Sequence, residues 1–176
     1  ALLHGRLAAH LRPDGEAAHL LSAQILDNQE QYALAIDAYS VIDPQSPWFI
    51  SAELGRADAL ERSGKLDGAL EVMRHLAKIE PQQLSVMNGL GDMLRQNERY
   101  DEASEAYTKA LALLETENES HWVLYYSRGI TYERTDRWDQ AEADFRRALE
   151  LRPDQPSVLN YLGYSLVELR RNLEEA

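Results

Sequence analysis

Apolar side chains recur along this chain at intervals of three and four residues, in short runs that are separated by polar turns. Between Gly89 and Leu113, one run carries Leu90, Met93 and Leu94, and a second run follows a polar turn. This spacing is typical of one apolar face of an α-helix. The pattern therefore predicts pairs of helices, and in each pair a short turn reverses the direction of the chain.

The helical pairs follow one another with a regular period. An alanine at the start of the second helix of each pair marks the phase, and the intervals between successive markers are 34, 34, 34, 38 and 35 residues. A random sequence could match one or two such intervals but not five. The markers are Ala1, Ala35, Ala69, Ala103, Ala141 and Ala176. Because one helical pair cannot bury its apolar face alone, the period predicts a stacked array of copies.

Within each pair, the small and aromatic side chains resemble those of the tetratricopeptide repeat family. In residues 82–116 the marks are Leu90-Gly91, Leu94, Tyr100, Ala103, Tyr107 and Ala110. Residues 117–153 match the pattern best, and residues 156–176 are also similar to repeats of bacterial members of the family. The resemblance covers essentially the whole chain. It implies an all-α fold, a right-handed superhelical solenoid of antiparallel helix-turn-helix repeats with about ten helices.

Residues 1–176 are thus predicted to form a single array. The expected segments are helix B of an incomplete repeat at 1–13, whole repeats at 14–46, 47–81, 82–116 and 117–153, and helix A of an incomplete repeat at 154–176. Because Pro44 comes early, helix B of the first repeat is expected to be short by most of a turn. Ser46 is the expected N-cap of the next helix, with Pro47 at its first position. The polar residues 115–120 are expected to form a longer loop or an extra helical turn.

Three glycines fall inside predicted helices, at positions 91, 129 and 163. A glycine costs about 0.5–1 kcal/mol relative to alanine in a helix interior, so a compensating contact is expected. We predict that helix B of each repeat approaches helix A closely there, with Gly91 facing Ala103, Gly129 facing Ala141 and Gly163 facing Ala176.

Charge narrows the choice of partner. The chain has 30 acidic residues against 18 lysines and arginines, a formal charge of -12, which repels a phosphate backbone and disfavours nucleic acid. The fourth repeat is locally basic, but acids are interleaved with its arginines, which predicts helical surface pairs rather than an RNA-binding stripe. No apolar run of 18 residues is present, so no membrane insertion is expected. The absence of cysteine excludes disulfides and fits a soluble segment in cytoplasm or bacterial periplasm equally.

In this family the first helix of each repeat lines the concave face of the superhelix, so the resemblance implies which side chains point into a groove. These are Gln24, Leu54, Asp58, Ser85, Asn88, Asp92, Val123, Tyr126, Ile130, Asn160, Tyr161 and Tyr164. An aromatic, amide and acidic lining suits a protein or peptide with apolar anchors and a basic side chain that Asp58 or Asp92 could pair with. The alternative is that the tyrosines pack within the chain and the acids form a solvated face. The lysine-containing clamp with which some members grip a C-terminal carboxylate is missing at these positions.

Nothing in the sequence predicts catalysis. The five histidines have no metal-ligand spacing, and carboxylates occur on every helix without singling out a general acid and base, so no catalytic, metal or cofactor residues are expected. The leading interpretation is a non-enzymatic scaffold or adaptor that binds a protein or peptide. The alternative is a structural or oligomerisation segment of a larger protein, with self-association through the incomplete repeats at the two ends.

Overall fold

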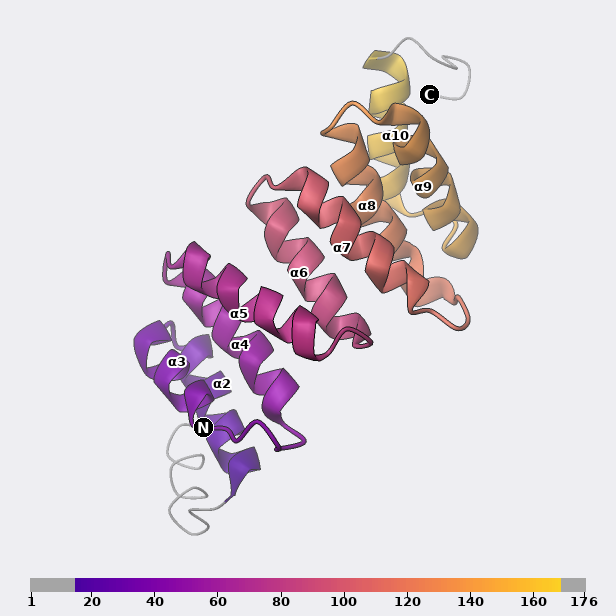
Figure 1. Ribbon diagram of the computed structural model, residues 1–176. Helices are drawn as coiled ribbons and strands as arrows, with labels where there is room; N and C mark the ends of the chain where they lie inside the picture. Colours follow the sequence, from indigo (N-terminus) through magenta and orange to yellow (C-terminus); the bar gives the residue numbers. More distant parts are fainter. Residues whose placement is uncertain (1–14, 169–176) are drawn as a thin grey trace. The chain divides into compact units, whose positions relative to one another are not determined.

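The computed structural model describes residues 15–168, and these residues form helices and no strands (Figure 1). The helices are α2 (Glu16–Asn28), α3 (Tyr32–Ser40), α4 (Phe49–Arg62), α5 (Leu66–Ile79), α6 (Leu84–Gln96), α7 (Tyr100–Ala112), the 3-10 turn η1 (Glu119–His121), α8 (Trp122–Glu133), α9 (Trp138–Leu151) and α10 (Pro156–Glu168). The all-α prediction is confirmed. The helix expected within residues 1–13 lies outside the described residues.

The chain divides into two compact units after Pro81. The first unit, described from residue 15, holds the hairpins α2–α3 and α4–α5, and the second unit holds α6–α7, α8–α9 and the single helix α10. Within each unit, helix B of one hairpin packs against helix A of the next, as α3 does on α4 and α7 on α8. The division coincides with the predicted boundary between repeats at 81 and 82; the prediction of one continuous array stays a prediction.

Each hairpin turns through one residue with a left-handed backbone. The φ values are 58° to 81°, at Glu30, Gly64, Glu98 and Asp136. In the second hairpin, the Lys65 N–H then donates to the carbonyl oxygen of Leu60 at 2.9 Å, the Schellman closure of a helix C-terminus. Helix A therefore ends at the same place in every repeat, although only one of the four turns has the glycine that this conformation favours.

The glycines in helix A make room for aromatic rings. A Cβ atom on Gly91 would lie 2.7 Å from Cε1 of Tyr107, and one on Gly129 would lie 2.6 Å from Cε1 of Phe145. At these two glycines, the prediction that they face the marker alanines is therefore wrong; Ala176, in the third predicted pair, lies outside the described residues. The ring one turn beyond the alanine on helix B is long enough to reach the backbone of helix A. Burial of each ring offsets the conformational cost of the glycine.

In the first unit, a glycine of helix A also contacts an aromatic ring, but the ring comes from a different hairpin. A Cβ atom on Gly55 of α4 would lie 2.5 Å from the ring of Tyr39, which comes from helix B of the preceding repeat. Tyr39 is 3% exposed and belongs to the core formed by α2, α3 and α4, together with Leu20 and Leu26. Ring and glycine thus join two hairpins here rather than two helices of one hairpin.

The two segments of irregular period have definite structures. Helix α3 has 9 residues and α5 has 14, so helix B of the first repeat is the shorter one, as the early proline predicts. The expected N-cap at Ser46 is wrong, because α4 begins at Phe49 with Trp48 as its N-cap; the Ser46 hydroxyl instead donates to Glu16 at 2.5 Å and accepts from the Trp48 N–H at 3.2 Å. In the polar segment 115–120, residues 115–118 form a loop and the last two residues belong to the 3-10 turn η1.

Candidate functional site

The second unit carries most of the predicted groove residues, on α6, α8 and α10. Helices α6 and α8 contact each other, and α8 meets α10 through tyrosine rings. The exposed members are Ser85, Val123, Asn160 and Tyr164, and the partly buried members are Asn88, Asp92, Tyr126, Ile130 and Tyr161. We call these nine residues the helix-A face of the second unit.

Aromatic side chains form the centre of this face. The Tyr126 ring lies edge-on to the Tyr161 ring with centroids 6.2 Å apart, and the Trp122 ring lies 5.7 Å from Tyr126. Tyr164, on the same helix as Tyr161, is 67% exposed. The sequence prediction missed Trp122, although its place one turn before Tyr126 on the same helix is the signal that could have found it.

Part of the aromatic cluster belongs to the core. Tyr126, Ile130 and Tyr161 pack against the buried cluster that contains Phe145, whereas Tyr164 is not among the residues packed there. The Tyr161 hydroxyl also donates to Glu133 at 3.1 Å. Tyr126 and Tyr161 therefore serve as a fixed base, and Tyr164 offers the freely accessible ring.

The acid of this face is already bound within the chain. Asp92 accepts from the Tyr107 hydroxyl at 2.7 Å and from the Asn88 amide at 3.0 Å, and it pairs with Arg95 at 3.6 Å. Arg95 Nε in turn donates to the Tyr107 hydroxyl at 3.1 Å. The sequence prediction singled out Asp92 but missed Arg95, which approaches it from the next turn of α6.

The first unit carries the remaining three predicted residues on α2 and α4. Gln24 and Asp58 are exposed, and Leu54 is half-buried. Asp58 pairs with Arg62 at 3.5 Å, and Arg62 also reaches Asp27 of α2 at 3.2 Å. Burial raises the pKa of Asp27 although Arg62 lowers it. Asp58, like Asp92, therefore faces a cation of the chain itself.

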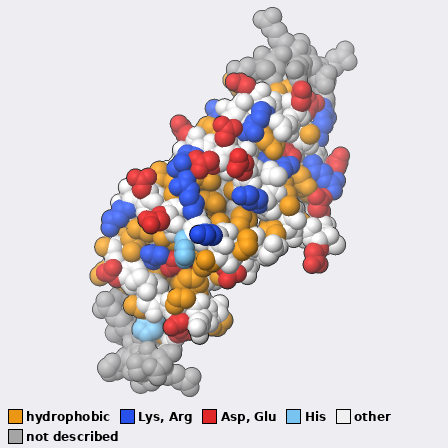
Figure 2. Space-filling view, viewed as in Figure 1, with side chains coloured by type: hydrophobic (Ala, Val, Ile, Leu, Met, Phe, Trp, Pro, Cys, Tyr) orange, Lys and Arg blue, Asp and Glu red, His pale blue; other side chains and the backbone are white. Residues whose placement is uncertain are grey.

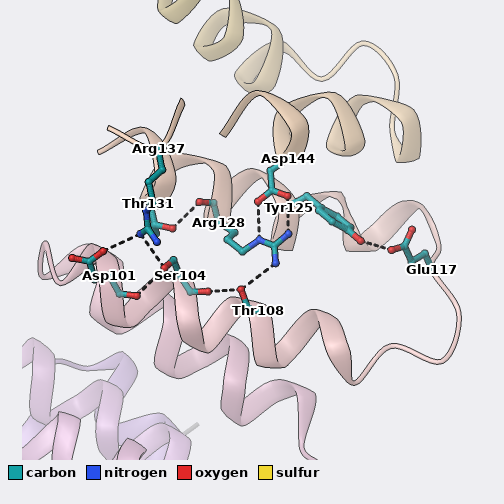
Figure 3. Close-up of polar contacts among 9 residues, drawn as sticks. All are labelled: Asp101, Ser104, Thr108, Glu117, Tyr125, Arg128, Thr131, Arg137 and Asp144. Atoms are coloured by element: carbon teal, nitrogen blue, oxygen red, sulfur yellow. Dashed lines mark hydrogen bonds and ion pairs between the residues drawn. The ribbon is translucent and has the colours of Figure 1, made fainter. Parts of the chain in front are cut away.

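A buried ion pair joins the two helices of the α8–α9 hairpin and also reaches α7 (Figure 3). Arg128 of α8 donates to both carboxylate oxygens of Asp144 on α9, at 2.7 and 2.8 Å, and its third nitrogen donates to the Thr108 hydroxyl of α7 at 3.1 Å. Asp144 is 5% exposed, and burial raises its pKa although the hydrogen bonds from Arg128 lower it. This pair therefore fastens α8, α9 and α7 to one another.

Other arginines of the fourth repeat also join separate elements. Arg137 donates to Asp101 at 3.0 Å and to Ser104 at 3.1 Å, both on α7 (Figure 3). Glu117, in the loop before η1, accepts from Arg147 and from the Tyr125 hydroxyl. The prediction of helical surface pairs holds for Arg146, which pairs with Glu142 at 2.8 Å, but is wrong for the arginines that cross between helices.

The charges of the described surface are mixed. On the face drawn in Figure 2, acidic and basic side chains alternate, and apolar atoms appear between them. No group of three histidines, acids or cysteines within residues 15–168 could hold a metal ion. In the same part of the chain, no helix combines the length and the apolar character that a membrane span requires.

Two tyrosines should make stability depend on alkaline pH. Burial, together with Asp27, raises the pKa of Tyr39 to about 12, and burial, together with Glu133, raises that of Tyr161 to about 12. Tyrosine in an unfolded chain ionises near pH ~10. The folded state therefore retains these protons longer, and its stabilisation is complete below about pH 10 and is lost as the pH rises through about 12. We expect circular dichroism to record unfolding in that interval.

A titration of tyrosinate absorbance checks this directly. The folded protein should show a late-ionising fraction that is missing in urea and is reduced in the Tyr161→Phe variant. A folded-state titration that superimposes on the titration in urea would contradict the expectation.

Comparison with known proteins identifies the fold. A profile of the tetratricopeptide repeat family matches residues 82–154. A TPR repeat-containing protein of Pseudomonas aeruginosa is 26% identical over 164 residues, which cover 92% of this chain and 27% of that protein. Residues 82–154 therefore match the tetratricopeptide repeat (TPR) family, and the chain as a whole is similar to TPR proteins.

TPR relatives occur in bacteria and in eukaryotes. The tetratricopeptide repeat protein 36 homolog of Drosophila melanogaster is 36% identical over 99 residues, which are 54% of this chain and 52% of the fly protein. The chain thus spans only about a quarter to a half of the length of these two relatives. A solved MamA structure shares the TPR fold with a TM-score of 0.71 at 19% identity, over 91% of this chain and 90% of its own.

The similarity to TPR proteins directs attention to surfaces that could bind another protein. TPR proteins generally mediate protein–protein interactions. Both hairpins of the second unit are held by a ring that packs on a glycine, and α8–α9 also by a buried ion pair, so these aromatic and arginine side chains are used within the fold. Tyr164, which lies on the same helix as Tyr161, is the most exposed aromatic side chain of the described residues.

Proposed function

We propose that this protein is a non-enzymatic scaffold that binds a protein or peptide on the helix-A face of its second unit. The observation that carries the proposal is the aromatic centre of that face. Tyr126 and Tyr161 are fixed by their contacts with the core, and Tyr164, on the same helix as Tyr161, exposes two-thirds of its surface. Aromatic side chains on a rigid base are typical of the few residues that supply most of the binding energy in an interface.

The charges favour an apolar anchor on the partner. Asp92 is satisfied by Tyr107, Asn88 and Arg95, and Glu133 accepts from Tyr161 and lies 3.6 Å from Arg134. A partner lysine would have to displace these contacts. The proposed ligand segment therefore places an aliphatic or aromatic side chain on the tyrosines, and exposed amides such as Asn160 would bind its backbone.

Alanine substitution at two tyrosines tests the proposal. With the protein as bait in a pull-down, Tyr126→Ala and Tyr164→Ala should each weaken capture of a partner by about tenfold or more, as loss of an interface anchor does. Tyr164→Ala is the cleaner variant because the fold does not need that ring. The binding constant of each captured protein, measured afterwards with purified components, gives the size of the effect.

Trp48→Ala provides the matched control. Trp48 is also an exposed aromatic, 43% accessible, but it precedes α4 in the first unit and is not a residue of the helix-A face. Its replacement should leave capture unchanged. Capture that persists in both tyrosine variants and falls with Trp48→Ala would refute the assignment of the face.

A second candidate function is self-association through α10. Leu159 and Val167 of this helix are 47% and 55% exposed, and Tyr164 on the same helix is 67% exposed, so α10 presents several apolar side chains at its surface. Sedimentation velocity of the wild type and of Leu159→Ser with Val167→Ser distinguishes this role. A concentration-dependent dimer that the double variant abolishes supports it, and a monomer at all concentrations excludes it.

A further inference from the structure

A pocket of about 510 Å³ opens on α4 and α5 of the first unit, away from the residues considered so far. Its lining residues are Arg56, Leu60, Gly68, Glu71, Val72 and His75. Leu60 and Val72, which are 9% and 7% exposed, form an apolar floor, and Glu71 and His75 are exposed. The volume lies within the range of ligand-binding pockets, which is about 300–1,000 Å³.

At the equivalent position of the second unit, side chains of neighbouring elements occupy the space that is open in the first unit. Because Ala69 and Ala141 mark the same phase, the pocket positions of α4 and α5 have counterparts on α8 and α9. Arg56 corresponds to Arg128, Val72 to Asp144 and His75 to Arg147. There, Arg128 donates to Thr108 of α7, and Arg147 donates to Glu117 from the loop that follows α7. In the second unit, α7 and the loop that follows it thus contact the side chains of α8 and α9 at this position.

The pocket of the first unit is open because its preceding helix B is short. Helix α3 ends at Ser40, the counterpart of Thr108, whereas α7 continues beyond Thr108 to Ala112. The Ser40 hydroxyl donates to the Asp37 carbonyl oxygen of its own helix at 2.8 Å rather than toward Arg56. All the lining residues come from α4 and α5. Because α3 ends early, it does not cover the surface of α4 and α5 whose counterpart on α8 and α9 is covered by α7.

The charges at the pocket indicate what could fill it. Arg56 donates to both carboxylate oxygens of Glu53, at 2.8 and 2.5 Å, so its charge is already balanced. Glu71 forms no hydrogen bond or ion pair with any described residue, which leaves one unpaired negative charge at the rim. Residues 15–81 hold 11 acidic against five basic residues, which reinforces the negative field.

We propose that this pocket is a second binding site, for a partner segment that places a basic side chain beside an apolar one. The basic side chain pairs with Glu71, and the apolar one packs on Leu60 and Val72. The third nitrogen of Arg56 is the counterpart of the one that donates to Thr108 in the second unit. It donates to no described residue and can donate to a backbone carbonyl oxygen of the segment. The site differs from the helix-A face in residues and in preferred charge.

A blocked variant and a charge variant test the site. A Cβ atom on Gly68 would meet Leu60 Cδ2 at 3.7 Å, an ordinary contact, so Gly68→Leu should fold and project its side chain into the pocket. Glu71→Lys reverses the charge of the rim. Its matched control is Glu105→Lys, because Glu105 occupies the same repeat position on α7 and is also exposed. Circular dichroism confirms that each variant is folded.

The probe is a library of random short peptides displayed on phage, selected on the wild type and sequenced. We expect enrichment of peptides with lysine or arginine next to leucine, isoleucine or phenylalanine. For a synthetic copy of an enriched peptide, Gly68→Leu should weaken binding about tenfold or more, Glu71→Lys by about three- to tenfold, and Glu105→Lys should have no effect.

The alternative outcomes overturn the proposal. It is wrong if no basic and apolar motif is enriched, if Gly68→Leu leaves the affinity unchanged, or if Glu105→Lys acts as strongly as Glu71→Lys. Peptides that lose affinity in Tyr164→Ala but not in Gly68→Leu belong to the helix-A face, so failure of this site is distinguishable from failure of the proposed function.

Discussion

Replacement of Gly91 or Gly129 by alanine is expected to lower the free energy of unfolding by about 1–3 kcal/mol, the usual cost of an overpacked core. The new methyl group would lie 2.7 Å from Tyr107 at one site and 2.6 Å from Phe145 at the other. Both rings are fully buried, and the Tyr107 hydroxyl is also held by Asp92 and Arg95, so neither ring can move aside without disturbing its surroundings. Urea denaturation followed by circular dichroism measures the loss.

Gly68→Ala is the control for this prediction. Gly68 also lies inside a helix, but its methyl group would meet Leu60 at 3.7 Å, and alanine is the better helix former by about 0.5–1 kcal/mol. This variant should therefore be as stable as the wild type or more stable. Equal destabilisation by all three changes would mean that the ring contacts are not what requires glycine.

The second large effect is expected at the buried pair of Arg128 and Asp144. Arg128→Ala leaves a carboxylate that is 5% exposed without its cation, and such a loss costs about 3–5 kcal/mol. The double variant Arg128→Leu with Asp144→Val should recover most of that stability, because it installs the apolar side chains that other repeats have at these positions, as Leu90 and Val72. A double-mutant cycle by urea denaturation gives the coupling energy.

The pH dependence of the Arg128→Ala variant provides a separate test. Burial raises the pKa of Asp144 even beside Arg128, and loss of the arginine removes the hydrogen bonds that oppose this shift. A raised folded-state pKa contributes stability at low pH that is lost as the pH rises through it. The variant should therefore regain stability in mildly acidic buffer.

Arg99→Ala is the surface control for the buried pair. Arg99 pairs with Glu102 at 2.6 Å, but both side chains are well exposed, and such pairs contribute at most about 1 kcal/mol. Two results would contradict the role assigned to burial. One is an equal loss of unfolding free energy in Arg99→Ala and Arg128→Ala. The other is a loss of unfolding free energy in Arg128→Ala that is the same at acidic and neutral pH.

The charged side chains of the two units differ in their consequence for binding. The arginines that cross between helices hold the hairpins of the second unit together, so they are poor candidates for partner recognition. In the first unit, Arg56 pairs with Glu53 and Arg62 pairs with two acids, and Glu71 at the pocket has no partner among residues 15–168. The two proposed sites would therefore select different segments, one through rings and one through charge beside an apolar floor.

The sequence by itself determined the repeats and most helix boundaries. Helix α2 (Glu16–Asn28) begins near the start of the repeat predicted at 14–46, and the turns fall where polar residues interrupt the pattern. These features are local, because helix formation and termination depend on residues within a few positions of each other. The same spacing, with the family resemblance, also placed Tyr126, Tyr161 and Tyr164 on first helices of repeats.

Only the tertiary structure decided which side chain meets which. Tyr107 rather than Ala103 occupies the space at Gly91, and Arg128 reaches Asp144. Helix α3 ends too early to cover the pocket at Gly68. Each of these contacts depends on helices that are separated along the chain. A periodic sequence offers each helix many equivalent neighbours, and ring length, helix length and burial of charge select among them. The choice between a core tyrosine and an accessible one, on which the proposed function depends, is made at that level.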